Sequence, residues 1–476
     1  MQDLATFSVD YARSLGASYA EARIQRETGN TVILKNGNPE FSAFGDQVGV
    51  GIRVLAKGAL GFAATNKLEK RNLRKVVESA LTMARASSSL VKRKIRMSEA
   101  RAFRDRYVVK AKKDAESVSV EEKLKLLLEA DKALVTDGKG ALSARLIQLG
   151  DGVTEKTYVN SDGASIVSVV PRVSLFYALT AIAEGRETAQ RVSQLGESRG
   201  WEAVEEWDLP EYLSREGSLL VNIVEKAKKP PEGEVDLVLG SEVVGIICHE
   251  SCGHPCEADR ILGREAAQAG ESFVKPEMLG TRIGSDSVTI VDDPTLPDSY
   301  GFYLYDEEGI KARRRELIKN GIFTNFLHNR ETAAEMGTES NGSARSVAYN
   351  REPIVRMANT YMQPGDHRFE ELLEGIKEGV YIKTFMEWNI DDKRYNERYV
   401  GLEAYRVRNG ELGELVRNPV LEITTPGLYR SVDAVSRNVG YSAASCGKGD
   451  PMQGIPVYTG GGEVRLRKVR LGGRAK

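Results

Sequence analysis

Hydrophobic residues recur with a helical spacing at the start of the chain. Leu4, Phe7, Ala12 and Leu15 fall near one face of a helix, and acidic residues interrupt any apolar run. A secretory signal needs a continuous apolar core, which this segment lacks. The N-terminus therefore predicts an amphipathic helix that belongs to the fold.

The next residues alternate between apolar and polar side chains, as strands with one buried face do. The alternating segments are EARIQR, TVILKNG, VGVGIRVLA and GALGFAATN. The pair Lys57-Gly58 predicts a turn between the last two segments. Helical spacing returns in residues 68–88. This order predicts an antiparallel sheet with helices packed on it, an α+β arrangement.

The pattern repeats as far as residue 230. Residues 121–135 have helical spacing, residues 141–198 alternate as strands, and Asn160-Ser161-Asp162-Gly163 is a hairpin signal. A further helix is predicted over residues 211–229. Pro230 and Pro231 end this helix. We therefore expect a domain boundary there, with an N-terminal α+β domain over residues 1–230 and a second domain over residues 231–476.

The second half of the chain is predicted to be rich in strands. It opens with the apolar strand VDLVLG, after which Ser241 is a candidate N-cap for a helix that runs to about residue 262. Turn signals follow at short intervals, and residues 367–379 predict one more helix. The last residues, GGGEVRLRKVRLGGRAK, predict a final strand and a frayed basic tail.

Composition narrows the class of protein. Of 476 residues, 67 are Lys or Arg and 68 are Asp or Glu, so no basic excess favours nucleic-acid binding. We expect the basic stretch at residues 88–120 to be a solvated connector. No apolar run reaches the roughly 18 residues of a membrane span. The 4 cysteines are too few for a disulfide framework, so a cytoplasmic location without membrane attachment is expected.

Candidate chemistry gathers in one short segment. Cys248, Cys252 and Cys256 stand beside His249 and His254, which are two of the 4 histidines of the chain. The motif is HExxxH, whereas the familiar zinc-protease motif HExxH puts both histidines on one helix face. With one more residue between them, the two rings would point roughly 140° apart on an ideal helix. Joint binding of one metal therefore predicts a π-bulge, or a helix end near Gly253.

Zinc chemistry assigns the roles. Neutral imidazoles of His249 and His254 are suitable zinc ligands, and Glu250 is placed to act as the general base for a metal-activated water. The third ligand stays open among Cys252, Cys256, Glu257 and Cys446. The alternative interpretation is a buried helix in which the cysteines are small apolar fillers and His249 is a core histidine.

Longer blocks of sequence resemble the TldD/PmbA peptidase family. They are VDLVLGSEVVGIICHESCGHPCEADR, TRIGSDSVTIVDDPTLPDSYGFYLYDEEGI, LIKNGIFTNFLHNRETA, NGSARSVAYNREPIVRMANTYMQPGD, ITTPGLYRSVDAVSRN and SCGKGDPMQGIPV, with VGVGIRVLAKGALGFAATN near the N-terminus. HExxxH together with CGKG resembles the proteolytic branch, not the metal-free one. The resemblance implies a β-rich C-terminal metalloprotease domain with the metal motif on a helix, and zinc held by His249, His254 and Cys446. Pro255-Cys256 departs from the family pattern, which usually has Gly and a hydrophobic residue there.

The resemblance also implies a substrate and a partner. It indicates hydrolysis of unfolded or short peptides, bound as an added strand, by a homodimer or by a heterodimer with a metal-free paralogue. Arg356 and Asn359 are candidate substrate-binding residues, although a structural role is favoured for Arg356. The acidic pairs in Asp292-Asp293 and residues 306–309 are interpreted as turn residues.

Two other functions remain as alternatives. The chain could be a non-catalytic binding subunit that retains a structural zinc, in which case Glu250 would have no role as a base. A thiol redox protein is disfavoured, because Cys252 and Cys256 have CxxxC spacing and no βαβ context.

Overall fold

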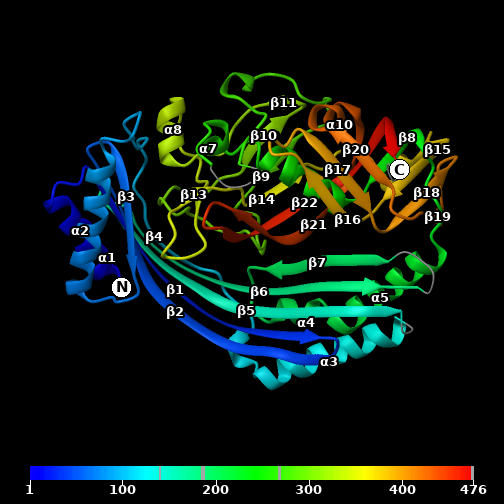
Figure 1. The fold of residues 1–476 in the computed structure, drawn as a ribbon, viewed down its shortest axis with the longest axis horizontal. Coiled ribbons are helices and arrows are strands. Elements are labelled where there is room, and N and C mark those ends of the chain that lie inside the picture. The colour runs from blue at the N-terminus through cyan, green and yellow to red at the C-terminus, as the bar shows by residue number, and fades with distance from the viewer. Residues whose placement is uncertain (139–140, 184–187, 266–269, 473–476) are drawn as a thin grey trace.

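The fold consists of a long curled sheet and a second, larger sheet that lies over its concave side (Figure 1). The structure is a computed structural model that describes residues 1–138, 141–183, 188–265 and 270–472. Both halves mix helices and strands, so the predicted α+β class is confirmed.

The curled sheet has 7 strands in the order β3-β2-β1-β5-β6-β4, with β7 also on β6. Its pairs are antiparallel, apart from β4 and β6, which run parallel. The strands are β1 (Tyr19–Lys35), β2 (Asn38–Ala56), β3 (Ala59–Thr65), β4 (Arg104–Val108), β5 (Leu142–Asn160), β6 (Ser165–Ala181) and β7 (Ala189–Glu197).

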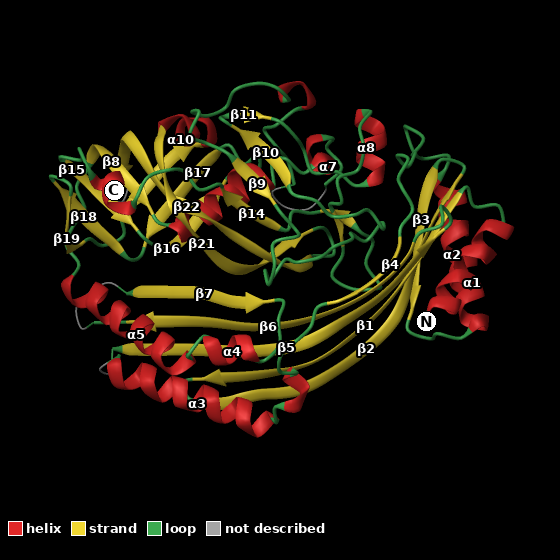
Figure 2. Ribbon diagram, turned by 180° about the vertical axis from the view of Figure 1, so that it is seen from behind, coloured by secondary structure: helices red, strands yellow, loops and turns green. Residues whose placement is uncertain are grey.

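Helices cover the convex side of this sheet, with α1 and α2 at one end and α3, α4 and α5 below the middle (Figure 2). They are α1 (Gln2–Ser14), α2 (Lys70–Ser87), η1 (Ala115–Ser117), α3 (Val120–Asp137), α4 (Glu202–Glu206) and α5 (Leu209–Lys226). Two apolar cores result, one under α1 and α2 and the other under α3 and α5. The start of α3 is fixed by a capping box, in which the Ser119 hydroxyl accepts the Glu122 N–H and the Glu122 carboxylate accepts the Ser119 N–H.

Both predicted hairpins of this half are present. Lys57 and Gly58 have φ of 52° and 76°, which is the left-handed geometry that a tight turn between β2 and β3 requires. The Asn160–Gly163 stretch joins β5 to β6. The basic stretch 88–120 is mostly exposed or half-buried, as expected of a connector, but it also contains β4, which its charges did not predict.

The second sheet has 13 strands, whose main path is β11-β10-β9-β14-β22-β8-β15-β18-β19. Strands β20 and β21 also pair with β22, and β17 joins β16 to β20. The strands are β8 (Gly233–Leu239), β9 (Ile290–Asp292), β10 (Arg315–Lys319), β11 (Ile322–Phe323), β14 (Asn359–Met362), β15 (Glu378–Ile382), β16 (Phe385–Ile390), β17 (Asn396–Gly401), β18 (Ala404–Arg408), β19 (Glu411–Leu415), β20 (Val420–Thr424), β21 (Val432–Lys448) and β22 (Gln453–Gly472). A separate pair consists of β12 (Ala344–Arg345) and β13 (Ile354–Val355).

Short helices surround this sheet, and one of them crosses it closely. They are α6 (Ser241–Cys248), η2 (His249–Gly253), α7 (Ala258–Ile261), η3 (Pro276–Met278), α8 (Arg330–Met336), α9 (Phe369–Leu373) and α10 (Thr425–Ser431). A Cβ added to Gly245 of α6 would lie 2.6 Å from the backbone nitrogen of Gly460 in β22. Glycine at position 245 is therefore what allows α6 to lie directly on β22.

Two local predictions for the second half are corrected, and a third is confirmed. Gly240 is the N-cap of α6, and Ser241 is already its first helical residue. The helix predicted over residues 367–379 is confined to α9, because from residue 378 the chain enters β15 and pairs with β8 and β18. The strand predicted at the C-terminus is confirmed as β22, whereas the predicted frayed tail at residues 473–476 lies outside the described residues.

The acidic pairs are buried, which the turn interpretation did not anticipate. Asp292 lies in β9 and forms an ion pair with Arg315 in the core. In the turn at residues 306–309, Glu307 pairs with Arg23 of β1 and Glu308 pairs with Arg53 of β2. Glu307 and Glu308 therefore fasten the second half of the chain to the curled sheet.

Within the described residues, none of the helices is long and apolar enough to cross a membrane.

Candidate metal centre

The backbone changes from α to π geometry at the metal motif. Helix α6 ends at Cys248, and residues 249–253 form the π-helical turn η2. The His254 N–H donates to the His249 carbonyl at 3.1 Å, which is the hydrogen bond that widens the turn by one residue. The predicted bulge is therefore confirmed. A Cβ added to Gly253 would lie 2.4 Å from the Met357 sulfur, so a larger residue here would have to displace this buried side chain.

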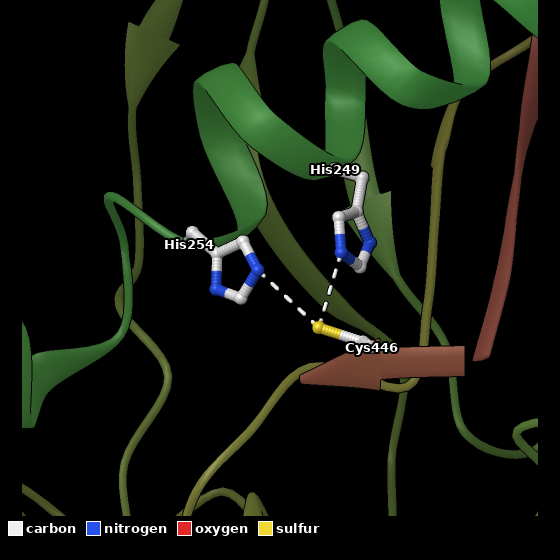
Figure 3. Close-up of side chains that lie close together, drawn as sticks. All are labelled: His249, His254 and Cys446. Atoms are coloured by element: carbon white, nitrogen blue, oxygen red, sulfur yellow. Dashed lines mark hydrogen bonds between the residues drawn. The ribbon is translucent and has the colours of Figure 1, made fainter. Parts of the chain in front are cut away.

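The widened turn places both imidazoles on the same side, opposite a cysteine from a distant strand (Figure 3). The Cys446 Sγ of β21 lies 3.2 Å from His249 Nε2 and 3.3 Å from His254 Nε2. The two rings are nearly perpendicular, at 82°, with their centres 4.8 Å apart. All three side chains are buried. Among the described residues, this is the group of three His, Cys, Asp or Glu side chains with metal-binding spacing.

The donor set fits zinc. Zn–N distances of about 2.0–2.1 Å and Zn–S distances of about 2.3 Å put the ligand atoms of a tetrahedral site about 3.5 Å apart. In the structure the three ligand atoms lie within 4.8 Å of one another. Two imidazoles and one thiolate leave one position of a tetrahedron for solvent, as catalytic zinc sites do.

Charge in the group favours the ligand form of the cysteine. Burial alone would raise the pKa of the Cys446 thiol, but the charges of His254, His249 and Arg356 outweigh burial and hold that pKa well below its ordinary value. Burial likewise disfavours the charged form of His249, yet the nearby Cys446 raises the pKa of His249. The surroundings thus favour the thiolate of Cys446, which is the form of cysteine that binds a metal cation.

A buried network of charges holds His254 in place. The Glu257 Oε2 atom accepts a hydrogen bond from His254 Nδ1 at 2.9 Å, which leaves His254 Nε2 facing Cys446. Arg260 Nε at 2.8 Å and Lys448 Nζ at 3.1 Å contact the same oxygen. Burial would raise the pKa of Glu257, but Lys448, His254 and Arg260 together hold it well below the ordinary value. The carboxylate therefore stays ionised.

The predicted base, Glu250, is buried beside the histidines and forms an ion pair with Arg394. Burial would raise the pKa of Glu250, but Arg394 and then His254 and His249 lower it. Arg394 has a left-handed backbone with φ of 61°, and its carbonyl accepts the Thr425 hydroxyl at 2.9 Å. This tight turn aims the guanidinium at Glu250.

A second buried carboxyl lies behind Glu250. Glu397 of β17 accepts hydrogen bonds from the hydroxyls of Tyr399 and Thr425, and the Tyr399 hydroxyl also lies 3.3 Å from the Ser251 hydroxyl. Burial raises the pKa of Glu397 to about 7, against the effect of these donors. Sequence reasoning missed Glu397 and Arg394, because nothing in the local pattern marks a residue that reaches the site from a distant strand or turn. Lys448 lies in the quoted CGKG segment and could have been singled out there.

The other candidate ligands have different surroundings. Cys252 and Cys256 lie fully buried in the apolar core with Cys248, as the filler interpretation expected. Glu257 binds His254 and does not join the group of three. His328 is buried, and its Nδ1 lies 3.3 Å from the Thr332 hydroxyl.

The two predicted substrate-binding residues contact their own chain. Arg356 is fully buried and donates to the carbonyls of Cys446 at 2.5 Å and Gln453 at 2.8 Å, so it fixes the β21–β22 hairpin beside the metal group. Asn359 is also fully buried, and its amide bonds the Asp293 carbonyl at 2.6 Å and the Ser299 hydroxyl at 2.8 Å. The contacts of Arg356 and Asn359 stabilise the fold. Substrate binding by either residue stays a prediction.

Comparison with known proteins identifies the family. Sequence models of the PmbA/TldA metallopeptidases match domain 1 at residues 20–84, the central domain at 113–229 and the C-terminal domain at 232–473. A metalloprotease of Methanocaldococcus jannaschii is 32% identical over 447 residues, which are 94% of this chain and 95% of that protein. The chain belongs to the PmbA/TldD metallopeptidase family. The resemblance inferred from the quoted blocks is thus confirmed.

Other members of the PmbA/TldD family support the same assignment. A protein of Saccharolobus solfataricus described as a zinc metalloprotease TldD homolog is 28% identical over 464 residues, 97% of this chain and 98% of that protein. The crystal structure of TldE from Thermococcus kodakarensis superposes with a TM-score of 0.75 at 17% identity, over 99% of this chain and 100% of that chain. The structural likeness shows the shared fold.

Proposed function

We propose that this chain is a zinc-dependent peptidase that hydrolyses unfolded or short peptides. The observation that carries the proposal is the group of His249, His254 and Cys446, which has three ligand atoms and Glu250 beside it. A zinc ion bound there would lower the pKa of its water, so that hydroxide is available at neutral pH to attack a peptide carbonyl.

Residues of the chain supply the proton chemistry. Glu250 stays ionised in its buried position because Arg394 and the histidines lower its pKa, so it can accept a proton from the attacking water. The same carboxyl can then deliver that proton to the departing amine. Glu257 holds the His254 ring in one orientation throughout.

The position of Cys446 supports an extended substrate. Strand β21 pairs with β22, and its residues 435–437 also hydrogen-bond to residues 365–367; beyond them, its outer edge has no strand partner within the described part of the chain. A peptide added along this free edge would pass the metal group, and backbone hydrogen bonds would bind it with little regard to sequence. An unfolded or short peptide can supply such an extended strand without first losing backbone hydrogen bonds of its own. A homodimer, or a heterodimer with a metal-free paralogue, stays a prediction.

The test combines metal analysis with peptide cleavage. We expect wild-type protein to bind about one zinc per chain and to cleave unstructured peptides, and Glu250→Gln to keep the zinc while cleavage falls about 10²–10⁴-fold. Glu403→Gln is a matched control, because Glu403 is buried but pairs with Lys383, away from the metal group. Full activity in Glu250→Gln would refute the role of Glu250. A zinc-loaded wild-type protein that cleaves no unstructured peptide would support the non-catalytic subunit instead.

A further inference from the structure

A cavity of about 660 Å³ lies between the concave face of the curled sheet and the second half of the chain. Strands β1, β2, β5 and β6 line one side, and loops near residues 300–307 and 344–347 line the other. Ser445, Gly454 and Pro456 of the β21–β22 hairpin also line it.

This cavity is adjacent to the metal group. Ser445 lines it, while the next residue, Cys446, faces the two histidines. Because successive side chains of a strand point to opposite faces, the hairpin separates the two spaces by the thickness of one strand. A peptide bound along β21 would thus have the cavity within reach of residues next to the cleaved bond.

Two arginines that line the cavity have no carboxylate partner among the described residues. Arg172 of β6 donates to the Tyr300 carbonyl through Nε at 3.2 Å and to the Phe302 carbonyl through Nη2 at 3.0 Å. Arg345 donates to the Met357 carbonyl at 2.8 Å and to the Pro456 carbonyl at 2.9 Å, and stacks over Tyr303 at 5.2 Å. Each guanidinium is held by neutral groups and forms no ion pair within the described residues, although Glu27 and Glu307 lie near enough to Arg172 to oppose the lowering of its pKa.

Most acids of the cavity are already engaged. Glu307 binds Arg23 and Lys156, and Asp151 binds Lys123. The Asp306 carboxylate accepts the N–H groups of Glu308, Ile310 and Ala344. Glu27 is exposed on the sheet and forms no ion pair within the described residues.

The charge imbalance also affects the arginines themselves. Burial, helped by the positive charges of Arg356 and Arg172, lowers the pKa of Arg345 to about 10, against the opposing effects of Tyr303 and Asp292. Burial lowers the pKa of Arg172 as well. Two like charges that are fixed near each other in a cavity gain most from an anion placed between them.

From this arrangement we infer that the cavity is a carboxylate-binding subsite, in which Arg172 and Arg345 hold a carboxylate of the peptide substrate. The carboxylate is the C-terminal group of a short peptide or an acidic side chain near the cleaved bond. The inference rests on the proposed peptidase function. It narrows the substrates to peptides that carry a carboxylate a few residues from the cleaved bond.

The experiment measures binding without cleavage. In the Glu250→Gln background, affinity is measured for three fluorescent peptides of one neutral sequence, with a free C-terminus, with a C-terminal amide, or with an amide and one added Glu. We expect the free acid to bind about tenfold more tightly than the neutral amide. Arg172→Gln and Arg345→Gln are each expected to reduce that preference to about twofold or less.

Controls separate charge from folding. Arg26→Gln removes a surface ion pair with Asp46 on the same sheet, outside the cavity lining, and is expected to leave the preference unchanged. Arg172→Lys and Arg345→Lys keep the charge and are expected to keep part of the preference. Tight binding of the Glu-containing amide would assign recognition to any carboxylate, and weak binding would assign it to the terminal one.

Equal affinity for acid and neutral peptides, unaffected by the arginine variants, would overturn the subsite. The two proposals fail separately. Carboxylate-selective binding by a protein whose wild type cleaves nothing would refute the peptidase and retain the subsite. Cleavage of the acid and amide peptides with the same kcat/KM would refute the subsite and retain the peptidase.

Discussion

The Arg394 guanidinium and the Glu250 carboxylate form a buried ion pair at the edge of the metal group. Removing one member of such a pair leaves an uncompensated charge and costs about 3–5 kcal/mol, whereas replacing both costs much less. We therefore expect Arg394→Met to lower the thermal unfolding midpoint strongly, and Arg394→Met/Glu250→Gln to unfold closer to wild type.

A double-mutant cycle tests this relationship. The decreases in the thermal unfolding midpoint of Glu250→Gln and Arg394→Met should add up to more than the decrease of the double variant, because the two side chains interact directly. Arg398→Met is the control, since Arg398 forms half-exposed surface pairs that contribute little. Strictly additive decreases in the unfolding midpoint for the changes at positions 250 and 394 would show that this ion pair does not contribute to stability.

The identity of the third ligand can be tested among the cysteines. Cys446 contacts both imidazoles, whereas Cys252 and Cys256 lie in the apolar core. We expect Cys446→Ser to lose bound zinc in dialysed protein, measured by elemental analysis. Cys256→Ala should keep zinc near one per chain, even where the lost packing lowers stability. Zinc retained by Cys446→Ser and lost by Cys256→Ala would reverse the assignment.

Glu257 is expected to tune zinc affinity without binding the ion. It fixes the orientation of His254 through Nδ1 at 2.9 Å and carries the charge that Lys448 and Arg260 balance. Loss of such a supporting contact typically weakens metal binding about 10–100-fold. Glu257→Gln should therefore raise the zinc dissociation constant by that factor in a chelator competition assay, while Glu331→Gln, on α8, should not. An unchanged constant would show that His254 is positioned by the backbone alone.

The sequence predicted the elements that local spacing determines. The alternation in residues 141–198, the turn at Lys57-Gly58 and the break after His249 are each encoded within a few residues, and each is present in the structure. The break was predictable because two ligands of one ion cannot point roughly 140° apart. The short α9 was overestimated, since pairing of β15 with β8 overrides helical spacing there.

The site was predictable only as far as its motif extends. Spacing gave His249, His254 and Glu250, but left the third ligand open among four residues. Cys446 lies on a strand about two hundred positions away, so only the family resemblance selected it. Arg394 and Glu397 reach the site through sheet pairing, which depends on contacts that no single segment encodes.

The π-turn at the metal motif depends on a close backbone contact. A Cβ on Gly253 would lie 2.4 Å from the Met357 sulfur, so Gly253→Ala must displace either the turn or Met357. Overpacking of this kind costs about 1–3 kcal/mol. We expect Gly253→Ala to lower the unfolding midpoint and zinc content, and Met357→Ala to restore part of both. Gly45→Ala, where an added Cβ meets open space, is the control. Normal zinc content in Gly253→Ala would show that the turn tolerates the methyl group.

Glu397 should make stability fall as the pH rises. Its pKa is raised from 4.5 to about 7 by burial, so between these values the folded chain holds a proton that the unfolded chain has lost. The stabilising contribution is therefore complete below about pH 4.5 and lost as the pH passes about 7, and the shift corresponds to about 3 kcal/mol. Glu397→Gln cannot ionise, so its unfolding midpoint relative to wild type should rise between pH 5 and about pH 8. The measurement is thermal unfolding of both proteins at equal zinc content, with Glu414→Gln as an exposed control. A difference between Glu397→Gln and wild type that does not change with pH would mean that Glu397 titrates normally in the folded protein.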